Sequence, residues 1–208
     1  MLFFMWISSC YNKNGDGTME IVELIEKEVK EKIEKYRLSS EDNYDFWNEH
    51  IKFVYEESIN LSKIYDADLT VVKLGALLHD IALIEKVGDR KEHHVNGAVL
   101  SKSILEKYNC PQEIVDKVIG CVINHRSAKN ATNVEELCVA DADIIAHFDN
   151  IPMLFNSAFN RNNIKLNEVR SWMRDAFEKD YNDLSTDTKK IFEQRYKEIC
   201  RVVLGEEI

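Results

Sequence analysis

The stretch Lys73–Ala82, KLGALLHDIA, places a histidine and an aspartate side by side in a strongly apolar part of the chain. Its leucines and isoleucine recur at the spacings of three and four residues that mark a helix packed into a core. His79 and Asp80 are therefore expected where water is scarce. A buried carboxylate is costly unless it is paired, hydrogen-bonded or bound to a cation. Because short dipeptides also arise by chance, the rest of the chain must show whether a cation belongs there.

The composition predicts a mostly helical globular protein. The chain has 208 residues, enough for a full core in one or at most two domains. Only 7 Gly and 2 Pro interrupt many Leu, Ile, Glu and Lys residues. The formal net charge of −10 argues against polymeric nucleic acid as a partner, because binding a phosphate backbone needs a basic face. No stretch approaches the roughly 18 apolar residues of a membrane span, so no membrane partner is expected.

The 5 cysteines are scattered, odd in number and without a CxxC spacing, which favours reduced thiols in a cytoplasmic protein over a zinc finger. Residues 1–18 are interpreted as an N-terminal extension and residues 19–208 as one helical domain. Across the boundary between these two parts, residues 12–23 resemble a calcium-binding loop with Gly17 at its sharp turn. The neutral Asn12 at the first ligand position and the lack of a second loop favour a polar turn that caps the next helix.

Apolar residues recur at helical spacing along most of the chain. The helices expected from this pattern cover residues 21–36, 44–65, 73–82, 93–108, 111–125, 133–148, 153–159, 169–177 and 191–204. Separate helices each place a histidine or an aspartate on an otherwise apolar face: His50, His79 with Asp80, His93, His125 and Asp141. Imidazoles and carboxylates gathered in a core are best satisfied by a shared cation, so these residues are interpreted as one metal site.

In order and spacing these residues resemble the HD superfamily of metal-dependent phosphohydrolases, whose fold is all-α. The resemblance runs from about residue 50 to residue 141, through LGALLHDIA, HHVNGA, VIGCVINH and VADADII. The metal-site core is accordingly expected at about residues 44–150. The resemblance implies that one metal ion is held by four residues: His50, His79, Asp80 and Asp141.

A subset of this family has two further histidines, which match His93 and His125. This match implies a second ion bridged by Asp80. His93 is preferred to His94 because the family's histidine stands four residues before the glycine matched by Gly97. Nitrogen and oxygen donors without thiolate suit one or two divalent transition-metal ions, namely iron, manganese, nickel, cobalt or zinc.

A cation in such a site lowers the pKa of a bound water and neutralises phosphoryl oxygens, which suits hydrolysis of a phosphate ester. Asp80 and His79 are expected at the centre of this chemistry. The candidate phosphate contacts are Arg126, Lys129 and Arg90, with a solvated surface charge as the alternative for each. Asp143 either holds a ligand histidine in one tautomer or faces solvent.

The chain is therefore predicted to be a phosphomonoesterase or phosphodiesterase that acts on a nucleotide or another small phosphate ester, as a monomer or homodimer. One alternative is a catalytically silent metal-binding or interaction domain of the same fold. Another is a calcium-responsive protein working through residues 12–23. The Gly-Tyr-Pro tripeptide of the family's cyclic-dinucleotide branch is missing, which puts a cyclic-dinucleotide substrate in doubt.

Overall fold

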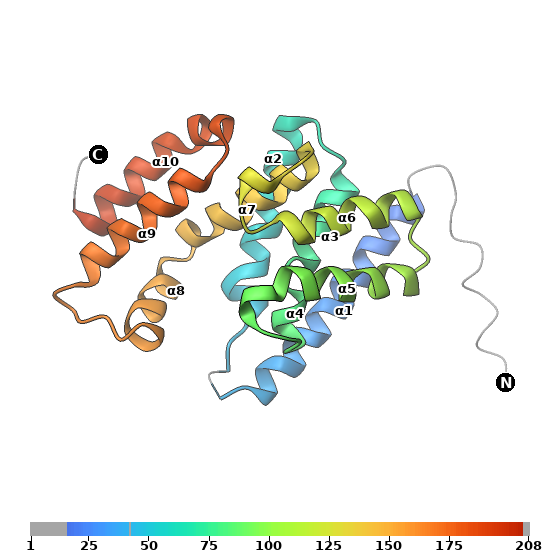
Figure 1. Ribbon diagram of the computed structural model, residues 1–208, viewed down its shortest axis with the longest axis horizontal. Coiled ribbons are helices and arrows are strands. Elements are labelled where there is room, and N and C mark those ends of the chain that lie inside the picture. The colour runs from blue at the N-terminus through green and yellow to red at the C-terminus, as the bar shows by residue number, and fades with distance from the viewer. Residues whose placement is uncertain (1–15, 42, 206–208) are drawn as a thin grey trace.

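The computed structural model describes residues 16–41 and 43–205 of the chain. In this part every regular element is helical, which confirms the all-α prediction (Figure 1). The elements are α1 (Asp16–Ser39), η1 (Trp47–Ile51), α2 (Lys52–Tyr65), α3 (Leu69–Leu78), α4 (Ile81–Ile84), η2 (Arg90–Glu92), α5 (His93–Lys107), α6 (Gln112–Asn124), η3 (Ala128–Asn130), α7 (Val134–Asp149), α8 (Ile151–Asn156), η4 (Ser157–Arg161), α9 (Val169–Asp183) and α10 (Thr186–Leu204). None of the described helices is long and apolar enough to cross a bilayer.

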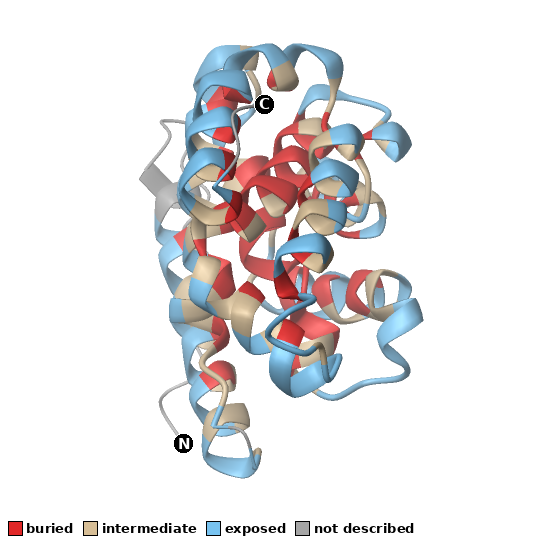
Figure 2. Cartoon of the chain, turned by 90° about the vertical axis from the view of Figure 1, so that its left-hand side faces the viewer, coloured by how far each residue is buried: buried red, intermediate tan, exposed pale blue. Residues whose placement is uncertain are grey.

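Helix α3 is the centre of the bundle. It packs against α1, α2, α6 and α7, and its residues from Val71 to Leu78 are buried except for Lys73. Figure 2 shows the buried residues gathered in the middle of the molecule. A Cβ atom on Gly75 would lie 2.8 Å from the Cβ of Cys121, so only glycine lets α3 and α6 approach this closely.

The helix expected over residues 73–82 is interrupted at the His-Asp pair. Helix α3 ends at Leu78, α4 begins at Ile81, and His79 and Asp80 form the turn between them. The carbonyl oxygen of Asp80 accepts the first bond of α4, from the Leu83 amide at 2.9 Å. Its carboxylate makes no capping bond and is available to the interior.

The helix expected over residues 44–65 likewise has two parts, because the segment that carries His50 is the π-helix η1. A π-helical turn adds a residue relative to the α-helix, a feature common at functional sites.

The calcium-loop hypothesis is only partly testable, since residues 1–15 lie outside the described residues. From Asp16 onward the chain is already helical, so residues 16–23 form the first turns of α1 and not the second half of a calcium loop.

The C-terminal helices α9 and α10 form a hairpin that packs on the end of α7 (Figure 1, orange and red). An aromatic cluster joins them: the Phe148 ring lies 5.1 Å from Phe177, 5.2 Å from Phe192 and 5.8 Å from Tyr196, between centroids. Helix α7 thus runs from the bundle core into the hairpin. The segment of α8 and η4 connects α7 to α9 on the outside of the molecule.

Candidate metal centre

Three histidines are oriented by the backbone of their own turn. The Nδ1 atom of each lies close to the carbonyl oxygen three residues earlier: His79 to Ala76 at 2.8 Å, His93 to Arg90 at 2.7 Å, and His125 to Val122 at 2.7 Å. Because a carbonyl can only accept, Nδ1 carries the proton and Nε2 presents a lone pair in the neutral ring. His79 and His125 are the C-cap residues of α3 and α6, where the last carbonyls of a helix need donors.

The Nε2 atoms of four histidines meet in two pairs. The Nε2 atoms of His93 and His125 lie 2.9 Å apart, and those of His50 and His79 lie 3.1 Å apart. The lone pairs of His93 and His125 repel each other at such a distance unless a proton or a cation lies between them. Ligands about 2.1 Å from one metal ion are about 3.0 to 3.4 Å apart at the angles of octahedral and tetrahedral sites. The spacing therefore fits a shared ion.

Asp80 stands between the two imidazole pairs. Its Oδ1 atom lies 3.2 Å from Nε2 of His93 and 3.9 Å from that of His125. Its Oδ2 atom lies 3.7 Å from Nε2 of both His50 and His79. Asp80 thus belongs to two sets of possible ligands, one with His50 and His79 and one with His93 and His125. Within each set, one ligand atom from each residue lies within 4.8 Å of the others, so Asp80 is placed to serve two ions.

The second carboxylate of the centre is Asp143, and the expectation that Asp141 would join it is corrected. Oδ1 of Asp143 lies 3.0 Å from Nε2 of His50 and 3.6 Å from that of His79. Residues two apart on α7 point about 200° apart around the helix, so the two aspartates face opposite partners. The Asp141 carboxylate accepts hydrogen bonds from Ser185 N at 2.9 Å, Ser185 Oγ at 2.6 Å and Thr188 Oγ1 at 2.5 Å.

The electrostatics of the centre favour ionised carboxylates and a neutral His125 ring. Burial alone would raise the pKa values of Asp80 and Asp143, but the surrounding imidazoles outweigh it and hold both well below the usual range. Burial lowers the pKa of His125 to about 4, so this ring is neutral at pH 7. Burial also opposes protonation of His93, yet the contact with Asp80 raises its pKa above the ordinary value.

His147 borders the centre, and the sequence patterns did not single it out. Its ring stacks on that of His50, with centroids 6.0 Å apart, and its Nδ1 lies 3.0 Å from Oδ2 of Asp180 on α9. About 33% of the His147 side chain is exposed, against 0% for His79, so His147 lies at the more exposed border of the centre and His79 at its buried floor. The available signal was its position one turn after Asp143 on α7.

Of the remaining residues predicted from sequence, some lie beside the centre and others lie away from it. Arg126 donates from Nη1 to the Lys91 carbonyl at 2.9 Å, and its charge acts on His93. Arg90 supports His93 through its carbonyl oxygen. Lys129 is exposed and pairs with Asp183 at 2.7 Å. His94 lies outside the cluster, with its ring 5.8 Å from that of His93 and a buried Nδ1 that has no hydrogen-bond partner.

Comparisons with known proteins agree with this picture at the level of the fold. Residues 47–147 match the family model described as HD domain. The Lin1889 protein from Listeria innocua has a crystal structure that superposes with a TM-score of 0.66 over 90% of this chain and 94% of that one, at 19% sequence identity. A tRNA (cytidine(56)-2'-O)-methyltransferase from Picrophilus torridus is 25% identical over 169 residues. The match covers 72% of this chain and 48% of that protein, so the chain spans about half the length of this relative.

Proposed function

Because residues 47–147 are an HD domain, we propose that the protein is a metal-dependent phosphohydrolase that acts on a nucleotide or another small phosphate ester. The observation that supports this proposal is the meeting of imidazole lone pairs around Asp80, with His93 and His125 Nε2 atoms 2.9 Å apart. A buried cluster of this kind needs a cation, and the partly exposed His147 marks the side from which a substrate would approach it.

The residues suited to hold a first ion are His50, His79, Asp80 and Asp143, and those suited to a second are Asp80, His93 and His125. Iron, manganese, nickel, cobalt and zinc all fit donors of this type. Burial raises the pKa of Cys138 to about 12 and that of Cys121 well above its usual range, so neither thiol competes as a thiolate. When bound, the metal would supply Lewis acidity toward phosphoryl oxygens and a more acidic water.

The chain's own groups then position the reaction. The Nδ1 bonds of His79 and His125 hold these rings at fixed angles on a floor that excludes bulk water. Arg126 is anchored through the Lys91 carbonyl beside His93, where its remaining donors can meet phosphoryl oxygens. The chain as a whole carries a net charge of −10, which repels an anionic substrate, so the positive charge of Arg126 beside the centre matters the more for binding.

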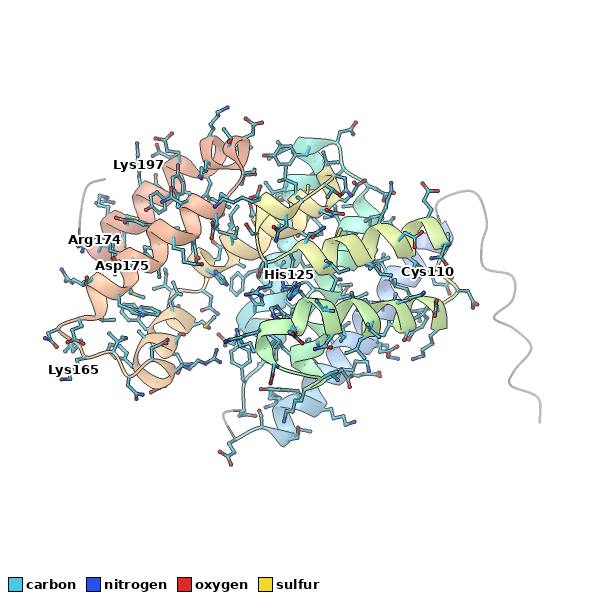
Figure 3. All side chains as sticks on the ribbon, in the orientation of Figure 1. Cys110, His125, Lys165, Arg174, Asp175 and Lys197 are labelled. Atoms are coloured by element: carbon cyan, nitrogen blue, oxygen red, sulfur yellow. The ribbon has the colours of Figure 1, made fainter. Side chains whose placement is uncertain are left out.

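The test is a screen of phosphate esters with Mn²⁺-loaded protein, together with elemental analysis of the purified protein. Asp80→Ala should abolish turnover and metal retention while the helical circular-dichroism spectrum persists. Asp175→Ala is the matched control, because Asp175 lies on α9 well apart from His125 (Figure 3). Metal retention without turnover of any ester would favour the catalytically silent domain. Turnover that survives Asp80→Ala would refute this site.

A further inference from the structure

A tyrosine and an arginine meet beside the metal centre without having a role in the chemistry described so far. Tyr44 lies just before η1, the segment that carries His50, and Arg161 is the last residue of η4. The guanidinium carbon of Arg161 lies 5.3 Å from the centroid of the Tyr44 ring, in a cation-π contact. The Tyr44 ring in turn rests edge-on against Phe46, at 4.8 Å between centroids. The arginine is therefore held by a ring that is itself packed.

The charges that act on Tyr44 place this pair next to the centre. Burial raises the pKa of the Tyr44 hydroxyl to about 12, and the charges of Arg161, Glu49, Asp80 and Arg90 all act on it. Asp80 is the carboxylate placed between the two imidazole pairs. Two guanidinium groups and the central carboxylate thus act on the same phenol. Geometry links each arginine to the centre: the Arg90 carbonyl oxygen lies 2.7 Å from Nδ1 of His93, and Arg161 contacts the ring of Tyr44 just before η1.

The segment that carries Arg161 is fastened to the wall of the centre. Asn150, which caps α8, donates from Nδ2 to the Glu49 carbonyl at 2.8 Å and to Glu49 Oε2 at 2.8 Å. Glu49 directly precedes His50 in η1. The α8 and η4 segment therefore starts at the ligand-bearing turn and comes back to it through Tyr44 and Arg161, so its position is tied to that of the centre at both ends.

The guanidinium groups of Arg161 and Arg90 remain available to a ligand. Both residues are exposed, and neither guanidinium makes a hydrogen bond or an ion pair with any residue that the structure describes. Arg37 and Arg195, by contrast, pair with Glu34 and Asp149. In a chain of net charge −10, two unpaired arginines near one site are a place for an anion.

We propose that Arg161 and Arg90 bind a second phosphate group of the substrate, with Tyr44 orienting Arg161, so that the site prefers compounds with two adjacent phosphates to monophosphates. This inference rests on the proposed function, because the first phosphate is assumed to lie at the metal centre near Arg126. The planar fork of an arginine matches phosphate oxygens in pairs, and a charge-assisted contact of this kind changes affinity by about tenfold or more.

The direct test is calorimetric titration of Mn²⁺-loaded protein with the α,β-methylene analogue of ADP and, separately, with inorganic phosphate. Arg161→Ala should weaken binding of the analogue about tenfold and that of phosphate less than twofold. Arg201→Ala, which removes an exposed arginine in the last turn of α10, should change neither. Equal weakening of both ligands by Arg161→Ala, or weakening of neither, would overturn the inference.

Variants of Tyr44 test the orienting role, with thermal unfolding as the check that each protein is folded. Tyr44→Phe keeps the ring and should retain the preference for the analogue, whereas a folded Tyr44→Ala protein should lose it as Arg161→Ala does. A folded Tyr44→Ala protein with its preference intact would refute the role of the tyrosine.

Turnover separates this inference from the proposed function. With a substrate in hand, Arg161→Ala should raise KM for a nucleoside diphosphate and leave KM for the monophosphate and both kcat values within twofold. If the wild type hydrolyses no ester yet binds the methylene analogue in an Arg161-dependent manner, the proposed function fails and the second-phosphate site stands. If turnover occurs and Arg161→Ala changes both KM values alike, the inference fails alone.

Discussion

The two aspartates of α7 offer the sharpest test of the site, because they are two residues apart and have different partners. Asp143 faces the imidazoles of His50 and His79, whereas Asp141 accepts three hydrogen bonds from Ser185 and Thr188 at the start of α10. Asp143→Ala should therefore remove a metal ligand and spare the fold. Asp141→Ala should spare the metal and weaken the fold.

The magnitudes follow from the contacts. Hydrogen bonds to a charged group contribute about 1.5 to 3 kcal/mol each, but burial raises the pKa of Asp141 in spite of these bonds, so desolvation of the charged carboxylate offsets most of that gain. The loss in Asp141→Ala then comes mainly from the donors of Ser185 and Thr188 that are left without an acceptor. Thr188 also keeps Tyr65 as a partner, at 2.7 Å between their oxygens. The expected loss for Asp141→Ala is about 2 to 4 kcal/mol, or roughly 5 to 15 °C in Tm for a chain of this size.

The assay is thermal unfolding in EDTA together with Mn²⁺ titration by calorimetry. Asp143→Ala should weaken Mn²⁺ binding more than about 100-fold, since even the partners that merely orient ligands are worth 10- to 100-fold. Its Tm in EDTA should stay within about 3 °C of the wild type. The reasoning is refuted if Asp141→Ala loses the metal at unchanged Tm, because the carboxylate implied by the family resemblance would then be the true ligand.

Three further outcomes are expected. Asp80→Ala should lower the metal content from about two ions to none and His93→Ala from about two to one, and elemental analysis showing two ions in the His93→Ala protein would contradict the bridging role. Protons compete with Mn²⁺ for the imidazole nitrogens, so Mn²⁺ affinity at the site of His93 and His125 should fall as the pH drops through the raised pKa of His93. Calorimetry that shows no change in affinity between about pH 8 and 6 would exclude this competition. Lysine and tyrosine partners outweigh burial and lower the pKa of Glu28 below 4.5, so its contribution is present above that value and is lost as the pH falls through the lowered pKa. Glu28→Gln should therefore be about 1 kcal/mol less stable than the wild type in urea unfolding at pH 7, and should equal it once the pH is below that pKa.

Periodicity predicted the helices and the inward-facing histidines because both depend on neighbours three and four residues away. His50, His79, His93 and His125 share faces with core residues, and the structure brings all four rings together. The start of α7 is likewise fixed locally, because the side chain of its N-cap Asn133 accepts from Glu136 N at 2.9 Å.

The errors arose where tertiary contacts decide between equal local patterns. Asp141 and Asp143 both follow apolar residues on α7, and only the position of α10 shows which of them is satisfied by Ser185 and Thr188. The same limit applies to His147, whose partner Asp180 comes from another helix. Nothing in the apolar spacing of KLGALLHDIA signals that the helix must stop at Leu78, since the apolar residues keep their helical recurrence to Ile81.

The difference between the histidines and the aspartates has a physical origin. Three of the imidazoles are fixed by a carbonyl three residues earlier, so their direction is set within one turn and survives any rearrangement of distant helices. The carboxylates have no such local bond: Asp80 and Asp143 are held by the imidazoles themselves. In the absence of a cation, the Nε2 atoms of His93 and His125 at 2.9 Å must share a proton or move apart. The fold thus supplies rigid nitrogen donors, and the carboxylates of Asp80 and Asp143 are positioned only by their contacts with those imidazoles. Because these contacts depend on how α3, α5, α6 and α7 pack together, metal affinity is coupled to that packing.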